Sequence, residues 1–327
     1  MKKMRIAALA AIALAPCAQA QTVYWQVVAA ESSQIATPNL PQGVSRDFTD
    51  VRLGDVGAGL VGFRVSSPSA SRGYWARSAQ GVLQPYVQLD VAGALGPGRS
   101  GAESGDVFHD YESGWGSAGA DGMRYFVGQA GAPGASSSGL SYGLWQWDGT
   151  RNVELARTLT DGPLGPNLGA GWVFPNSSSF VQGHLPTSAG TELFSARTTS
   201  PSGASGTATF KNVRGQGNQA CLIVGSTDPQ YSPGLGSGTF QSSPWAVATT
   251  PDGRYVGRFA TSNGREGLWE ICDGSPRPLV VDEETGARGP DIGIATAYFT
   301  SFYGNPLPGA NGTLYFVASL RADSGST

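Results

Sequence analysis

The sequence is poor in charge, in histidine and in cysteine. Of its 327 residues only 14% are charged, and it holds two histidines, His109 and His184, and three cysteines. The net charge of −3, with no basic run after residue 20, argues against a nucleic-acid surface or an anionic membrane as partner. Two histidines exclude a three-histidine metal site, and no Cys-x-x-Cys pair or phosphate-binding loop occurs. No cofactor and no metal site is therefore expected.

No apolar run is long enough to span a membrane. The first twenty residues instead resemble a secretion signal: Lys2, Lys3 and Arg5 precede an apolar stretch, which ends in Ala18-Gln19-Ala20. We expect cleavage after Ala20 and a periplasmic or extracellular location. The remaining chain has 18 basic and 24 acidic residues, a net charge of −6.

Two cysteines remain in this mature chain, Cys221 and Cys272. In an oxidising compartment they predict one disulfide, and two separate buried thiols are the alternative. The sequence leaves both open.

What the chain does have is glycine (48 residues), proline (21) and enough apolar residues (40%) to build a core. These residues recur in a unit of about 60 residues that carries three markers in constant order. A loop proline comes first, a phenylalanine opens a short strand, and a glycine starts a second strand. The prolines are Pro41, Pro97, Pro166, Pro233 and Pro290; the phenylalanines are Phe48, Phe108, Phe174, Phe240 and Phe299; the glycines are Gly59, Gly122, Gly190, Gly253 and Gly312.

Two further strands complete each unit. The third is aromatic after glycine and the fourth is aliphatic. The third strands begin at Gly73, Gly143, Gly206 and Gly267, and the fourth cover residues 83–89, 153–156, 221–224 and 279–281. Four short strands at this period predict an all-β propeller of five blades, formed by residues 21–327 as one domain.

The ends of the chain bear on how such a ring closes. Val23–Ala30 resembles an aliphatic fourth strand and is expected to close the ring by pairing with the last blade. The chain stops at Thr327, where that blade should supply its aromatic third strand. Either the last blade is incomplete or the chain continues beyond this sequence.

The glycine-led second strands resemble those of bacterial secreted tandem-repeat proteins of the NxxGxxAF type. The similarity covers the strands that start at Gly59, Gly122, Gly190 and Gly312, each with phenylalanine at the fifth position. The strand at Gly253 lacks that phenylalanine, and the leading asparagine is absent throughout. The resemblance implies a repeated β-fold outside the cytoplasm and implies no chemistry.

The densest polar cluster surrounds Phe108: Asp106, His109, Asp110, Tyr111 and Glu112. A histidine with carboxylates near the channel of a propeller would suit acid–base catalysis or cation binding, and a polar channel wall is the structural alternative. The candidate catalytic residues are His109, Asp110 and Glu112. Ser141, in a Gly-x-Ser-x-Gly match, precedes a strand where a nucleophile needs a strand-to-helix turn, so we interpret it as a loop residue.

A second charged patch lies before the fifth blade, in Asp282-Glu283-Glu284 with Arg288 and Asp291. Paired carboxylates suit glycoside hydrolysis only when they face each other across a cleft. Neighbours in one loop do not imply that arrangement, so we expect a solvated loop.

Aromatic residues near the first strands are the candidate ligand-binding residues: Trp115, Trp172, Trp245, Tyr298 and Tyr303. Exposed rings suit sugar stacking or protein contact, and packing between blades is the alternative. The loops between fourth and first strands, residues 88–105, 158–171, 226–238 and 282–297, are the natural place for recognition.

These observations favour a secreted binding or scaffolding module at the bacterial cell envelope, whose ligand is a glycan, a peptide or a partner protein. One rival is a polysaccharide-acting hydrolase or lyase that uses the Asp106–Glu112 segment. The other is a structural repeat protein without a ligand. The oligomeric state is open.

Overall fold

The computed structural model describes residues 47–53, 61–67, 72–77, 83–111, 117–118, 124–186, 191–213, 215–236, 238–242, 244, 246–250, 253–309 and 312–322. Within these ranges every regular element is a β-strand or one turn of 3-10 helix, so the chain is all-β as predicted. The predicted signal and Val23–Ala30 lie outside the described residues. The chain divides into two compact units, the first ending at Glu154 and the second beginning at Leu155.

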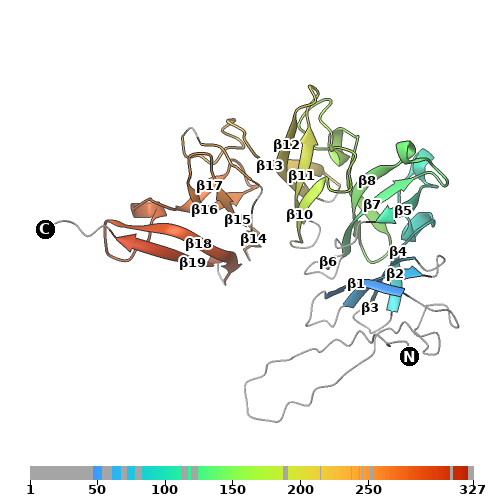
Figure 1. Cartoon of the computed structure of the whole chain (residues 1–327), viewed down its shortest axis with the longest axis horizontal. Helices are drawn as coiled ribbons and strands as arrows, with labels where there is room; N and C mark the ends of the chain where they lie inside the picture. Colours follow the sequence, from blue (N-terminus) through green and yellow to red (C-terminus); the bar gives the residue numbers. More distant parts are fainter. Residues whose placement is uncertain are drawn as a thin grey trace, which may run out of the picture. The chain divides into compact units, whose positions relative to one another are not determined.

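The first unit carries two antiparallel sheets (Figure 1). The first sheet has the order β1 (Asp47–Leu53), β2 (Val61–Ser67), β3 (Gly73–Arg77), β4 (Leu83–Gln88). The second has the order β5 (Val107–Tyr111), β7 (Arg124–Gly131), β8 (Ser141–Trp147), β9 (Asn152–Arg157), with β6 (Ser117–Ala118) also paired to β7.

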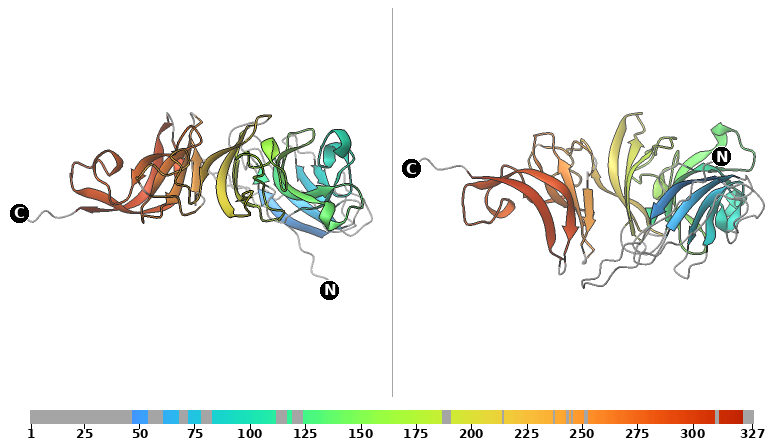
Figure 2. Two further views of the ribbon diagram at one scale, coloured as in Figure 1. Left: turned by 90° about the horizontal axis from the view of Figure 1, so that it is seen from above. Right: turned by 60° about the horizontal axis from the view of Figure 1, so that its bottom comes forward.

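The second unit carries three antiparallel sheets. The first two have the orders β10 (Val181–Pro186), β11 (Thr191–Thr199), β12 (Ser205–Val213), β13 (Gly217–Ile223) and β14 (Ala246–Thr249), β15 (Tyr255–Ala260), β16 (Glu266–Ile271), β17 (Arg277–Val281). The last sheet has two strands, β18 (Ala297–Pro308) and β19 (Leu314–Ala322), which form the long curved ribbon of Figure 2.

The four-stranded sheets predicted from the sequence are confirmed. The aromatic third strands are β3, β8, β12 and β16, and the aliphatic fourth strands are β4, β9, β13 and β17. The first strands differ from the prediction in the third and fourth sheets, where Phe174 and Phe240 each form a single bridge and regular pairing resumes only in β10 and β14. After Phe174 the reason is Pro175, which has no N–H for the ladder and begins a turn.

A trio of aromatic rings recurs in three sheets: the repeat phenylalanine, which lies in or before the first strand, and one ring from each of the next two strands. The trios are Phe108, Phe126 and Trp145; Phe174, Phe194 and Phe210; and Phe240, Phe259 and Trp269, with ring centroids 4.8–6.2 Å apart. All nine rings are fully buried. Rings of this size at these separations contribute a large part of the apolar area that a sheet buries.

The trio of the fourth sheet explains the missing phenylalanine of the strand that starts at Gly253. Gly257 stands at the fifth position, and a Cβ placed there would lie 2.5 Å from the ring of Phe259. Phe259 is two residues further along β15, on the same face, and its ring lies over the glycine. The aromatic position is therefore kept although the sequence pattern is broken.

The same backbone bond joins each fourth strand to the next phenylalanine. Asp90, Leu159, Gly225 and Glu283 all have positive φ, from 52° to 77°, and each donates its N–H to the carbonyl of Phe108, Phe174, Phe240 or Phe299 at 2.8–2.9 Å. The carbonyl of the first-strand phenylalanine thus anchors the connection from the preceding strand.

Three of the connecting loops share a Gly-x-x-Gly-Pro turn. The turns are residues 93–97, 162–166 and 286–290, and they contain the 3-10 helices η2 (Gly93–Leu95), η5 (Gly162–Leu164) and η6 (Gly286–Arg288). The second glycine is required because a Cβ on Gly96, Gly165 or Gly289 would lie 2.1–2.4 Å from a backbone carbonyl oxygen. The proline that follows is buried, and the indole N–H of Trp145 donates to the Pro97 carbonyl at 3.1 Å.

We expect Gly96→Ala to destabilise the protein by about 1–3 kcal/mol, because its Cβ would overlap the Val91 carbonyl oxygen at 2.1 Å. Gly105→Ala, in the same connection, meets nothing within 4 Å and should be nearly neutral. Urea unfolding of both variants measures the difference. Equal midpoints would contradict the role given to the turn.

Candidate functional site

Asp106, in the predicted polar cluster, lies in a buried ionic network centred on Arg99. The Arg99 guanidinium donates to Asp106 Oδ2 at 2.7 Å, to both carboxylate oxygens of Glu154 at 2.8 and 3.1 Å, and to Ser141 Oγ at 2.9 Å. It also lies 5.8 Å from the centroid of the Trp145 ring. The side chains of Arg99, Asp106 and Glu154 are 4%, 12% and 7% exposed, so one guanidinium pairs with two carboxylates away from solvent.

The described members of the candidate catalytic set are His109 and Asp110. His109 is half-buried, and its Nε2 lies 3.0 Å from the carbonyl oxygen of Ala132, to which it donates. Asp110 is exposed and follows a register irregularity between Phe108 and Asp110. Glu112 lies outside the described residues. No interaction joins His109 to Asp106, and the catalytic role of His109, Asp110 and Glu112 stays a prediction.

Sequence reasoning missed Arg99 and Glu154, which belong to a loop and to the strand β9. An isolated arginine in a glycine-rich loop gives no signal by itself, since its carboxylate partner is 55 residues away. Ser141, predicted as a loop residue, is the first residue of β8, and its hydroxyl accepts from Arg99.

The second charged patch is partly buried, contrary to the expectation of a solvated loop. Asp282 is 8% exposed and its Oδ1 accepts the Glu266 N–H at 2.8 Å, which fixes the start of β16. Burial raises the pKa of the Asp282 carboxyl. Because the protonated form is favoured in the folded state, this group adds stability below its ordinary pKa and loses it as the pH rises through the raised value. Arg265 pairs with Glu283 at 3.1 Å, so the carboxylates do not face one another as a catalytic pair would.

Three of the five predicted ligand-binding aromatics can be placed. Trp172 and Tyr298 are half-buried, and Tyr303 is exposed, with its hydroxyl 3.0 Å from Ser319 Oγ. Trp115 and Trp245 lie outside the described residues. Of the three placed candidates, Tyr303 of β18 is therefore the most exposed.

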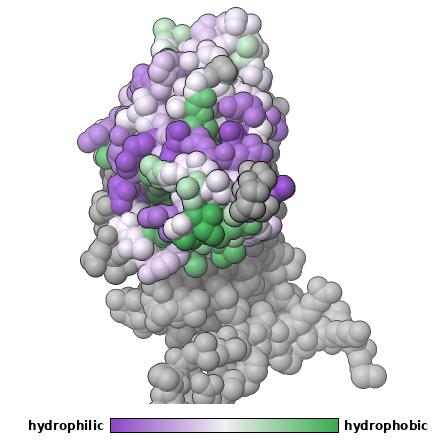
Figure 3. Space-filling view, turned by 90° about the vertical axis from the view of Figure 1, so that its left-hand side faces the viewer, coloured by the Kyte–Doolittle hydropathy of each residue, from purple (hydrophilic) through white to green (hydrophobic). Residues whose placement is uncertain are grey.

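Exposed large hydrophobic side chains in the described part of the chain fall into two groups. One lies on the last sheet: Tyr303, Leu307, Tyr315, Val317 and Leu320. The other lies in the connecting loops predicted for recognition: Val91, Leu159, Ile292 and Ile294. On the side of the second unit seen in Figure 3, hydrophobic atoms gather in a patch bordered by hydrophilic ones.

Leu159 is the most unusual of the loop residues. It is 59% exposed and has a φ of 60°, a left-handed conformation that leucine rarely adopts. The corresponding positions carry Asp90, Gly225 and Glu283. In the sequence, a comparison of these four equivalent positions would have identified the leucine as the apolar exception.

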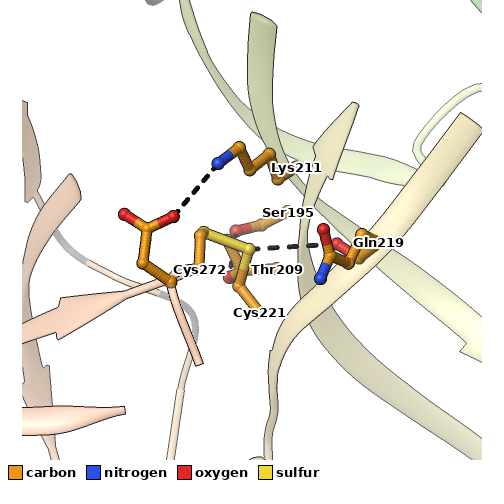
Figure 4. The surroundings of a disulfide bond; sticks show 7 residues. Ser195, Thr209, Lys211, Gln219, Cys221 and Cys272 are labelled. Carbon is orange, nitrogen blue, oxygen red and sulfur yellow. Dashed lines mark hydrogen bonds and ion pairs between the residues drawn. A yellow bond between two sulfur atoms is a disulfide. The ribbon is translucent and has the colours of Figure 1, made fainter. Parts of the chain in front are cut away.

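A disulfide joins Cys221 of β13 to Cys272, which follows β16, so the two adjacent sheets of the second unit are linked covalently (Figure 4). Both cysteines are buried. Beside them Lys211 Nζ pairs with Asp273 at 3.2 Å and lies 5.3 Å from the Tyr255 ring centroid. The sequence left the pairing open, and the structure places both sulfurs in one bond.

In the described ranges no three histidine, cysteine or carboxylate side chains are grouped as a metal site would require. Among the same residues, no helix has the length and apolarity to cross a membrane.

No family model and no curated protein matches the chain. Among solved structures it is similar to an α-L-arabinanase of Penicillium chrysogenum complexed with arabinobiose, with 13% identity and a TM-score of 0.27 over 81% of this chain and 71% of that chain. A likeness of this size carries no argument about activity, and the all-β architecture rests on the strand pairing of the chain itself.

We expect Glu154→Gln to lower the free energy of unfolding by about 3 kcal/mol, because a buried charge of Arg99 loses its bidentate partner. Asp110→Asn changes an exposed carboxylate and should alter it by less than about 0.5 kcal/mol. Denaturant titration of both variants measures this. A strong effect of Asp110→Asn alone would show that the ionic network is assigned to the wrong carboxylate.

Proposed function

We propose that the protein is an exported binding or scaffolding module of the bacterial cell envelope, which recognises its partner through the loops between fourth and first strands. The observation that carries this is Leu159, an exposed apolar side chain on a strained backbone. A leucine in the left-handed region costs about 1–2 kcal/mol relative to glycine. Stability alone would favour glycine, aspartate or asparagine there, so the leucine is best explained by contact with a partner.

The chemistry of the loops favours a peptide or protein partner over a glycan. Their exposed residues are aliphatic: Val91, Leu159, Ile292 and Ile294. Sugars are recognised by flat aromatic rings, whereas aliphatic side chains bury well against another protein. Trp172 and Tyr298, the aromatics next to these loops, are already half-buried.

The bases of these loops are suited to present such side chains. The connection that carries Leu159 is held by its bond to the Phe174 carbonyl and by the turn of residues 162–166. Asn218 Nδ2 also donates to the Gly165 carbonyl at 2.9 Å. A binding residue on a loop whose base is fixed loses little entropy when it binds.

Two features support export. The basic, apolar and small-residue segments of residues 1–20 have the order of a signal peptide. The bond between Cys221 and Cys272 is of a kind that persists in oxidising compartments.

For the architecture we propose the five-bladed ring, closed by the N-terminal strand Val23–Ala30. The exposed face of the last sheet supports it. Tyr315 is 62% exposed, whereas Leu193, which follows its glycine at the same spacing, is fully buried against Tyr255 and Trp269 of the adjacent sheet. The last sheet therefore exposes an apolar face, whereas the equivalent face around Leu193 is covered by the adjacent sheet.

We expect Leu159→Gly to keep or raise the melting temperature and to weaken partner binding at least tenfold. The matched control is Asp90→Gly, which relieves the same backbone position and removes no apolar side chain. The measurement is thermal unfolding with quantitative capture of envelope proteins by the mature wild type and both variants, beside a glycan array.

Undiminished capture by Leu159→Gly would refute the loop surface. Glycan binding that is insensitive to Leu159 would favour a lectin-like site, and polysaccharide cleavage lost in His109→Ala would favour the enzyme instead.

We expect the Cys221→Ala, Cys272→Ala double variant to lose on the order of 4 kcal/mol of stability, because the bond closes a loop of 51 residues in the unfolded chain. Thiol titration of the exported wild type under denaturing conditions should find no free thiol. Two titratable thiols per chain would contradict both the bond and the proposed compartment.

A further inference from the structure

The net charge of the mature chain resides in the loops between fourth and first strands. These loops, residues 88–105, 158–171, 226–238 and 282–297, hold eight acidic and two basic residues. Of the 18 basic and 24 acidic residues of the mature chain, this leaves sixteen of each for the rest, which therefore carries no net charge. A negative charge that is confined to the loops attracts a partner of the opposite sign to them.

Two carboxylates in the loops of the second unit differ from the carboxylates of its strands. Glu270 of β16 pairs with Arg254 and Arg277. Asp161 and Asp291 are exposed, and in the part of the chain that the structure describes no basic side chain pairs with either of them. The sheets thus use their carboxylates internally, whereas these two loops present theirs to solvent.

The turn that follows Asp161 does not require a carboxylate. Asp161 is the N-cap of η5, and the N-caps of η2 and η6 are Ala92 and Thr285. None of the three makes a side-chain bond to its helix. Asp161 Oδ2 accepts the Gly171 N–H at 3.5 Å, the limit of a hydrogen bond, and an asparagine oxygen could accept it equally. The negative charge of Asp161 therefore has no structural use.

Each of these two acids stands beside an exposed aliphatic residue. Leu159 precedes Asp161 by two residues and is 59% exposed. Ile292 follows Asp291 directly and is 50% exposed, and every residue of 291–296 is exposed. The combination of an unpaired acid and an uncovered aliphatic side chain therefore occurs in two loops, which follow different sheets.

We propose that the loops of residues 158–171 and 282–297 bind a cationic segment of a partner protein, in which aliphatic side chains stand beside arginine or lysine. This inference rests on the loop function proposed above and adds the chemistry of the partner. The aliphatic side chains of the partner bury against Leu159 and the isoleucines, and its basic side chains pair with Asp161 and Asp291. In such an interface apolar burial supplies most of the affinity, and the charges raise the association rate and reject acidic partners.

The same loops disfavour other classes of ligand. Their negative charge repels nucleic acids, anionic lipids and acidic polysaccharides. A metal ion needs several ligands gathered around one point, and within the described ranges no three carboxylate, histidine or cysteine side chains are grouped in that way. A polypeptide supplies a basic and an aliphatic side chain within a few residues of each other, which is the spacing that the loops offer.

The test uses three synthetic peptides and the mature chain. The first peptide alternates leucine and arginine, the second replaces each arginine by citrulline, and the third replaces each leucine by serine. Citrulline keeps the shape of arginine and removes its charge. Fluorescence anisotropy measures the dissociation constant of each labelled peptide at about 50 and about 500 mM salt, where charges are weakly and strongly screened.

We expect the leucine–arginine peptide to bind about tenfold more tightly than either of the others, and to lose most of this advantage at the higher salt concentration. The double variant Asp161→Asn, Asp291→Asn should weaken its binding about fivefold, which is the effect of two exposed charge pairs, and should leave the citrulline peptide unaffected.

The control is Asp273→Asn, which removes a carboxylate that already pairs with Lys211. It should change the affinity less than about twofold. Melting temperatures within about 2 °C of the wild type show that the variants are folded. Equal affinity of the double variant and the wild type would overturn the proposal. Equal binding of the citrulline peptide, or no binding of the leucine–arginine peptide, would overturn it as well.

Capture of envelope proteins separates this proposal from the loop function on which it rests. Capture that depends on Leu159 but is unchanged in the double variant would refute only the cationic chemistry of the partner. Peptide binding that depends on Asp161 and Asp291, together with capture that is insensitive to Leu159, would refute only the proposed loop function.

Discussion

The contact between a repeat phenylalanine and two further aromatic rings is the interaction on which three of the four-stranded sheets depend. Phe108 shows why, because its ring packs on Phe126 and Trp145 while its carbonyl accepts the Asp90 N–H. The same residue thus fixes the order of three strands and the end of the strand before it. Since Trp145 also donates to Pro97, the position of the ring further determines where the connecting loop can run. One residue both buries its ring in the core and accepts a backbone hydrogen bond from the preceding connection. The ring packing and this hydrogen bond therefore cannot change independently.

The buried residues of the sheets form a fixed frame, and the exposed residues of the connecting loops are free to vary. Two buried side chains of this frame bond to other groups of the frame. The Arg99 guanidinium donates to carboxylates, and Asn152 Nδ2 donates to the carbonyls of Tyr86 and Gly96 at 3.0 and 2.9 Å. A buried cluster of this kind resembles a catalytic site in sequence, since both need acids near a base. Burial distinguishes the two, because a catalytic acid needs access to a substrate. Exposed apolar side chains such as Leu159 have no such structural use, which is why recognition is assigned to the loops.

Strand order and the aromatic positions could be predicted because they depend on local patterns that recur. In the strand that begins Gly267-Leu268-Trp269, a Cβ on the glycine would lie 2.2 Å from the Val280 carbonyl oxygen. The glycine of the sequence pattern is therefore required by the close approach of the next strand. Partners far apart in sequence were harder to predict. The pairing of Arg99 with Glu154, 55 residues apart, was missed, and the bond of Cys221 with Cys272, 51 residues apart, was one of two open alternatives. The left-handed backbone conformation of Leu159 could not be predicted either, because leucine rarely adopts a positive φ.

The position of the disulfide follows from an exception among the loops. Three connections contain the Gly-x-x-Gly-Pro turn, but residues 226–238 do not, and their described part has no 3-10 helix. This connection joins the sheet of Cys221 to the sheet of Cys272. The adjacent trio is also the one in which Phe259 replaces a phenylalanine at Gly257. Where the turn is absent, a covalent link restricts the unfolded chain. We therefore interpret the bond as a local substitute for the turn, in which Cys221 and Cys272 hold two sheets together.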